Sequence, residues 1–161
     1  TPDFVCLSKG LTGGYLPMSV TLTSDKVYSA FYDDDIKKGF LHSHSYTGNP
    51  LACSAALGTL SIFESDNVLK KNLILSKKIN RLFSSLEDLP ITDLRNIGMI
   101  WAFELDSKIS IDKVLAYSLN KGVLIRPIDN TIYFMPPYCI KETEAREMIK
   151  ITREAILYAS T

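Results

Sequence analysis

The sequence lacks an excess of charge of either sign. Eighteen lysine and arginine residues balance eighteen aspartate and glutamate residues, which gives a formal net charge of zero at pH 7. Proteins that bind a phosphate backbone or an anionic membrane surface generally carry a surplus of positive charge. We therefore expect neither a nucleic acid nor a membrane as a partner.

Cysteines are few, and long apolar runs are absent. The three cysteines, Cys6, Cys53 and Cys139, lie far apart and form no CxxC pair, so neither a disulfide framework nor a zinc site is predicted. No stretch approaches the ~20 apolar residues of a membrane span, and no basic segment followed by an apolar one opens the chain. These features predict a cytoplasmic protein.

The chain also lacks an initial methionine, and the apolar run Phe4–Leu7 follows its start almost at once. Such a run is typical of a buried strand rather than of a frayed terminus. We therefore expect the chain to begin inside a larger domain. Hydrophobic residues make up 46% of its 161 residues and charged ones 22%, as in packed globular proteins.

The hydrophobic pattern predicts strands and helices in mixed order. We expect a boundary between two domains near Ser65. Residues 1–65 would be the end of one domain and residues 66–161 would form a second, in an α/β or α+β architecture. Asn49 or Gly48 would cap a tightly packed helix of small residues. The predicted strands are 4–7, 18–22, 91–97, 99–105, 123–125 and 132–134, and the predicted helices are 24–31, 50–63, 67–86, 110–120 and 143–158.

Lys9 follows the first predicted strand and precedes Gly10. A loop between two strands could hold its amine in a largely desolvated pocket, where the neutral, nucleophilic form is favoured. The alternative is an ordinary exposed lysine at the end of a strand.

Three further polar positions have both a functional and a structural interpretation. Ser45 precedes a helix, where a hydroxyl can donate to a phosphate or simply form a turn. Arg126 lies between apolar residues, where it could bind a substrate carboxylate or a carboxylate of the protein. His42 and His44 have no cysteine or carboxylate to complete a metal site, so we predict loop packing and no metal.

Three segments resemble motifs of one family, the class III pyridoxal-phosphate-dependent aminotransferases. Residues 2–17, PDFVCLSKGLTGGYLP, resemble its cofactor-lysine motif, and residues 42–53, HSHSYTGNPLAC, resemble a second motif that reaches the cofactor phosphate. Residues 122–127, GVLIRP, with residues 132–138, IYFMPPY, resemble the carboxylate-recognition segment of the biotin-biosynthesis branch.

The resemblance implies the type I fold of pyridoxal-phosphate-dependent transferases, here the C-terminal part of the large domain and the α+β small domain. It implies that Lys9 bonds covalently to pyridoxal 5'-phosphate and that Ser45 reaches the cofactor phosphate of the neighbouring subunit. Arg126, Tyr133 and Gly14 fall on substrate-contacting positions. The same resemblance implies a homodimer with its active site at the interface.

For the biotin branch, the implied reaction transfers an amino group from S-adenosylmethionine to 8-amino-7-oxononanoate. Two alternatives remain: another class III ω-aminotransferase or aminomutase, or a piece that is not catalytic by itself. The family's N-terminal half, with its pyridine-binding aspartate and glycine-rich phosphate turn, has no counterpart here. Ser45 also stands where threonine is usual in the family.

Overall fold

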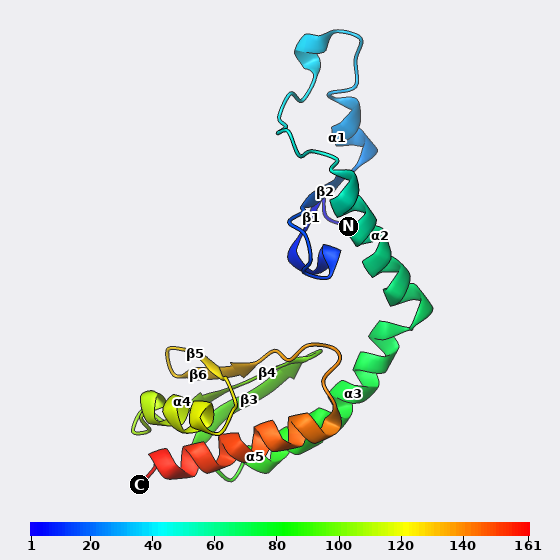
Figure 1. The fold of residues 1–161 in the computed structure, drawn as a ribbon. Helices are drawn as coiled ribbons and strands as arrows, with labels where there is room; N and C mark the ends of the chain where they lie inside the picture. Colours follow the sequence, from blue (N-terminus) through cyan, green and yellow to red (C-terminus); the bar gives the residue numbers. More distant parts are fainter. The chain divides into compact units, whose positions relative to one another are not determined.

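The computed structural model describes residues 1–161, which divide into two compact units, Thr1–Val68 and Leu69–Thr161 (Figure 1). No helix in either unit combines the length and the apolar character that crossing a membrane requires.

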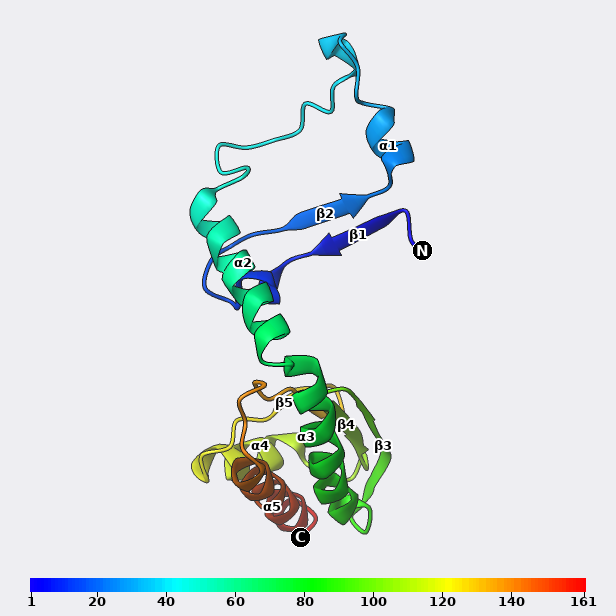
Figure 2. The same cartoon turned by 90° about the vertical axis from the view of Figure 1, so that its right-hand side faces the viewer.

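The first unit is built on a β-hairpin and one long helix. Strands β1 (Phe4–Leu7) and β2 (Val20–Thr23) pair antiparallel, and the short 3-10 helix η1 (Lys9–Thr12) lies between them. Figure 2 shows helix α2 (Pro50–Ser65) running beside this hairpin. The connection from β2 to α2 contains the short helices α1 (Asp25–Ser29) and η2 (Ile36–Lys38).

Very little of this first unit is buried. Only Thr12, Ala52 and Ala56 are buried, and every residue of β1 is exposed. The prediction of a strand at Phe4–Leu7 is confirmed, whereas the prediction that it is buried is wrong for this chain, because a lone two-stranded hairpin has no second layer to cover it. The expected tight packing of α2 is likewise limited to its two buried alanines.

The second unit contains a four-stranded antiparallel sheet in the order β3-β4-β6-β5. Its helices α3, α4 and α5 lie on one side of the sheet (Figures 1 and 2). The elements are α3 (Val68–Phe83), η3 (Ser84–Leu86), β3 (Ile91–Ile97), β4 (Ile100–Leu105), α4 (Ile111–Asn120), β5 (Arg126–Ile128), β6 (Thr131–Phe134) and α5 (Glu142–Ala159).

Alternation along β4 places the core on the helical side of the sheet. Trp101, Phe103 and Leu105 are buried, while the residues between them are more exposed, as expected for a strand with one face covered. Trp101 stacks on Phe83 of α3 with ring centroids 5.3 Å apart, and Phe134 of β6 meets Phe83 edge-on. The second unit therefore has the continuous core that the first lacks.

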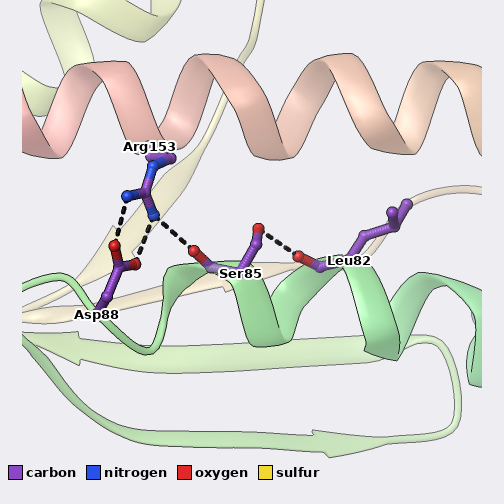
Figure 3. Close-up of polar contacts among 4 residues, drawn as sticks. All are labelled: Leu82, Ser85, Asp88 and Arg153. Carbon is purple, nitrogen blue, oxygen red and sulfur yellow. Dashed lines mark hydrogen bonds and ion pairs between the residues drawn. The ribbon is translucent and has the colours of Figure 1, made fainter.

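Polar contacts join the end of α5 to the segment that follows α3. Arg153 donates two hydrogen bonds to the carboxylate of Asp88 and a third, of 2.6 Å, to the backbone oxygen of Ser85 (Figure 3). A bidentate arginine–carboxylate pair fixes both partners in direction as well as in distance. This pair ties two segments that lie 65 residues apart in sequence.

Candidate functional site

Lys9 opens η1 in a left-handed backbone conformation, with φ of 50°. Such a conformation is uncommon for a residue with a Cβ and persists only when the surroundings impose it. The Lys9 side chain is exposed. The desolvated pocket predicted for its amine is therefore not formed by this chain alone.

A buried threonine and a glycine turn fix the loop that carries Lys9. The Thr12 hydroxyl donates to the backbone oxygen of Leu16 at 2.6 Å and accepts from its N–H at 3.3 Å. Gly13 and Gly14 have φ of 64° and 82°, and a Cβ on Gly13 would lie 3.3 Å from Oγ1 of Thr59 on α2. Close approach of α2 thus requires glycine at position 13, whereas Gly14 faces open space.

The segment before α2 forms a turn rich in hydroxyl groups. The Thr47 hydroxyl accepts from the His44 N–H at 3.1 Å, and His44 Nδ1 accepts from the Tyr46 N–H at 3.1 Å. Asn49 caps α2 by accepting from the Leu51 N–H at 3.0 Å. Ser45, in the middle of this turn, is exposed and makes no hydrogen bond within the chain.

A cavity of about 650 Å³ lies between this turn and the residues that follow the glycine turn. That volume is within the range of complete small-molecule sites. Its lining combines apolar side chains with the polar groups of the turn, although neither Lys9 nor Ser45 is among the lining residues. These are Leu16, Pro17, Met18, Ser19, His44, Tyr46, Thr47, Gly48, Asn49 and Ala52.

In the second unit, Arg126 of β5 lies directly opposite Tyr133 of β6. Opposed residues of an antiparallel pair project their side chains from the same face. Arg126 is exposed and forms no ion pair within the chain. The alternative of a salt bridge to a carboxylate of this chain is therefore not realised.

Both residues line a smaller cavity of about 190 Å³. Its remaining lining is apolar and comes from Leu124, Phe134, Met135, Pro136 and Met148. This volume is well below the ~300–1,000 Å³ of complete ligand pockets, so it suits one end of a ligand. The guanidinium of Arg126 supplies the only charged side chain, which suits an anionic end.

The site residues predicted from the sequence thus fall into two groups. Lys9, Gly14 and Ser45 belong to the first unit, and Arg126 and Tyr133 belong to the second. No group of three or more histidine, cysteine or acidic side chains is arranged to hold a metal ion. His44 has a structural role in its turn, as expected.

Comparison with known proteins decides the family. The family described as Aminotransferase class-III matches residues 1–156 of the chain. The chain belongs to the class-III aminotransferases. Enzymes of this family depend on pyridoxal phosphate, so the predicted family and its cofactor are confirmed.

Two relatives share the name adenosylmethionine-8-amino-7-oxononanoate aminotransferase. The protein from Helicobacter pylori is 48% identical over 92% of this chain and 36% of its own length. The protein from Methanocaldococcus jannaschii is 38% identical over 96% of this chain and 36% of its own length. The chain therefore spans little more than a third of these class-III relatives.

Solved structures give the same result for the fold. The crystal structure of the aminotransferase of that name from M. jannaschii matches the whole chain and 40% of its own, with a TM-score of 0.91 and 38% identity. An aminotransferase from Bacillus anthracis matches with a TM-score of 0.87 and 27% identity, over 98% of this chain and 39% of its own. The predicted fold class, part of a pyridoxal-phosphate-dependent transferase, is confirmed.

Sequence reasoning missed several residues that shape these sites. Thr12 bonds the backbone of Leu16 across the glycine turn, Thr59 of α2 lies close to Gly13, and Thr47 accepts from the His44 N–H in the turn around Ser45. Met148 lines the Arg126 cavity from α5. The positive φ of Gly13 could have been anticipated from its glycine pair, whereas contacts between distant segments leave no signal in a single sequence.

Proposed function

We propose that the protein containing this chain is a pyridoxal-phosphate-dependent aminotransferase of biotin biosynthesis. It would take the amino group of S-adenosylmethionine and transfer it to 8-amino-7-oxononanoate, giving 7,8-diaminononanoate. The name shared by the relatives from H. pylori and M. jannaschii supports this assignment. One structural observation supports it further: Arg126, which forms no ion pair within the chain, lines a small cavity together with Tyr133 and five apolar residues.

Arg126 would bind the carboxylate of the keto acid. Its planar fork can donate two parallel hydrogen bonds to a carboxylate, and within the chain no ion pair competes for it. Tyr133, directly opposite, would line the carboxylate site and limit the directions from which the acid can enter. This pair would orient the substrate without taking part in bond making.

Lys9 would be the catalytic residue. Pyridoxal phosphate, when bound, supplies an aldehyde that condenses with amines and a ring that accepts electrons from the reacting carbon. The exposed primary amine of Lys9 fits the aldehyde. Its Nζ would bind there covalently, be released by the amino donor, and then take a proton from the donor carbon and hand it on.

Ser45 would donate a hydrogen bond to the cofactor phosphate. Its hydroxyl is exposed, has no partner within the chain and lies just ahead of the 16-residue helix α2, so it fits a phosphate dianion. Gly14, with φ of 82° and open space around its Cα, would leave room for substrate near the Lys9 loop. The desolvation that Lys9 needs would come from residues outside this chain.

We further propose that the enzyme is a homodimer in which Ser45 serves the cofactor of the neighbouring subunit. Residues 1–65 would belong to the large cofactor-binding domain and residues 66–161 to the C-terminal small domain. The scarcity of buried residues in the first unit supports the assignment of residues 1–65 to a larger domain, since Thr12, Ala52 and Ala56 alone cannot form a domain core.

The direct test uses the full-length enzyme with 8-amino-7-oxononanoate as acceptor. S-adenosylmethionine, alanine and lysine are supplied in turn, and 7,8-diaminononanoate is measured by mass spectrometry. We expect product with S-adenosylmethionine at a rate well above that with the other two donors. Faster turnover with alanine or lysine would instead assign another class III ω-aminotransferase activity.

A further inference from the structure

We propose that Met148 of α5 is a specificity-determining residue of the Arg126 cavity. Because of Met148, the cavity accepts a carboxylic acid whose carboxylate is attached to methylene carbons. It rejects a carboxylic acid that carries a charged amine next to the carboxylate. The proposal rests on the proposed function, because it takes Arg126 as the residue that binds the substrate carboxylate. It adds a residue from a different element and a chemical rule for what may lie next to that carboxylate.

The composition of the cavity carries the argument. Arg126 and Tyr133 are its only polar side chains, and its other five lining residues are apolar. No acidic side chain lines it. An α-amino acid bound through its carboxylate would bring its ammonium group into this space, where no anionic side chain would compensate for the water it loses.

The position of Met148 explains why this helix residue matters. Met148 is partly buried and packs against the core of the second unit, so its main chain cannot move away easily. Its backbone oxygen accepts a hydrogen bond of 2.8 Å from the Thr152 hydroxyl inside α5. The residue is thus held by its helix and lines the cavity, and its thioether side chain is flexible.

The size of the cavity restricts the rule to the carbons nearest the carboxylate. About 190 Å³ is too small for a whole substrate. Met148 would therefore contact the carbons next to the carboxylate, and other residues would contact the distant reacting carbons. A carboxylic acid whose amino or keto group lies far down an alkyl chain, such as the proposed keto acid, satisfies this rule. S-adenosylmethionine, whose amine lies beside its carboxylate, does not, so Arg126 would not bind the carboxylate of the donor.

The experiment measures binding in the full-length protein by NMR of methionine methyl groups labelled with ¹³C. The cofactor is bound as pyridoxamine phosphate, which has no aldehyde to condense with an amine probe. Two probes are titrated: nonanoate, and 2-aminononanoate, which differs by an amine beside the carboxylate. The Met148 methyl signal is identified by its loss in Met148→Leu. We expect nonanoate to shift this signal and to bind at least tenfold more tightly than 2-aminononanoate.

Two substitutions on α5 test the role of the side chain. Met148→Gln keeps the length but introduces a carbonyl that can accept from an ammonium, so the preference for nonanoate should fall about tenfold, in line with the ~1–3 kcal/mol cost of an unpaired buried polar group. Lys150→Gln introduces the same residue at an exposed position of the same helix and should leave the preference unchanged. Met148→Leu should also preserve it.

The outcomes separate this proposal from the proposed function. An unchanged preference in Met148→Gln, or no shift of the Met148 signal with nonanoate, would overturn the role of Met148 even if the enzyme makes 7,8-diaminononanoate. Selective nonanoate binding that depends on Met148, in a protein that does not make 7,8-diaminononanoate, would support this role and remove the proposed reaction.

Discussion

Arg126 and Tyr133 occupy opposing positions of the β5–β6 pair, so one tight hairpin brings a cation and a phenol to the same face. Only Asp129 and Asn130 separate the two strands. Local pairing therefore fixes this relationship, without help from distant parts of the chain. A carboxylate site built on a hairpin can keep its geometry while its surroundings vary.

Replacing Arg126 by lysine tests this carboxylate site. Lysine keeps the charge but loses the fork that donates two hydrogen bonds, and hydrogen bonds to charged groups contribute about 1.5–3 kcal/mol each. We expect KM for the keto acid to rise about tenfold or more with little change in kcat, as measured by steady-state kinetics of the full-length enzyme. Arg95→Lys is the matched control, because Arg95 lies in the same sheet but pairs with Asp93 and Glu104. An equal rise in KM for the keto acid in Arg95→Lys would argue against Arg126 as the carboxylate-binding residue.

The glycine turn beside Lys9 gives a second prediction. Gly13→Ala adds a Cβ at a positive φ and 3.3 Å from Thr59 Oγ1, which should cost about 1–3 kcal/mol through backbone strain. We expect the full-length enzyme to unfold at a lower temperature and to lose the cofactor absorbance that depends on Lys9. Gly10→Ala is the control, since Gly10 has no positive φ and nothing within 4 Å of a Cβ, and it should retain both properties.

Most helices and strands could be predicted from the hydrophobic pattern, because the spacing of apolar residues that identifies a helix or a strand lies within that segment. Strand β5 is the exception: a strand was predicted at 123–125, but the structure places it at Arg126–Ile128. Pro127 lies inside the observed strand and has no N–H to donate to a neighbouring strand. The observed sheet order puts β5 at an edge, where one side of the strand needs no partner and proline is tolerated.

The candidate site was less accessible to sequence reasoning than the fold. Lys9, Ser45 and Arg126 stand in recognisable motifs, but the exposure of Lys9 depends on what packs over its loop, which no local pattern records. Met148 falls within the helix predicted at 143–158, and nothing local in the sequence relates it to Arg126. Its position at the Arg126 cavity arises from packing of α5 against the sheet, 22 residues after Arg126.

The unequal burial of the two units leads to a third prediction. In the isolated 161-residue chain, backbone amides of β4 and α5 should be protected from hydrogen exchange, because both elements contribute to the core. Amides of β1 and β2 should exchange rapidly, since that hairpin has no buried residue. Added pyridoxal phosphate should give no stable Lys9-dependent absorption band. Equal protection in both units, measured by mass spectrometry, would contradict this account.

The Arg153–Asp88 pair predicts a dependence of stability on pH. Hydrogen bonds from the Arg153 guanidinium hold the pKa of Asp88 below its ordinary value of 3.8. Because the folded-state pKa is the lower one, the pair stabilises the fold above 3.8, and this contribution is lost as the pH falls through the lowered value. The Asp88 side chain is largely exposed and that of Arg153 is partly exposed, so the effect on Tm should be a few degrees at most.

The substitution Asp88→Asn should reveal this dependence. At neutral pH the variant should unfold at a lower temperature than the parent, because Arg153 loses its ionised partner while its bond to the Ser85 oxygen can remain. The difference in Tm, followed by circular dichroism, should shrink toward zero in acid, where the parent's Asp88 is protonated too. Asp129→Asn, at an exposed turn position with no ion pair, should show no such difference at either pH. A gap between Asp88→Asn and the parent that persisted unchanged in acid would show that the ion pair is not its cause.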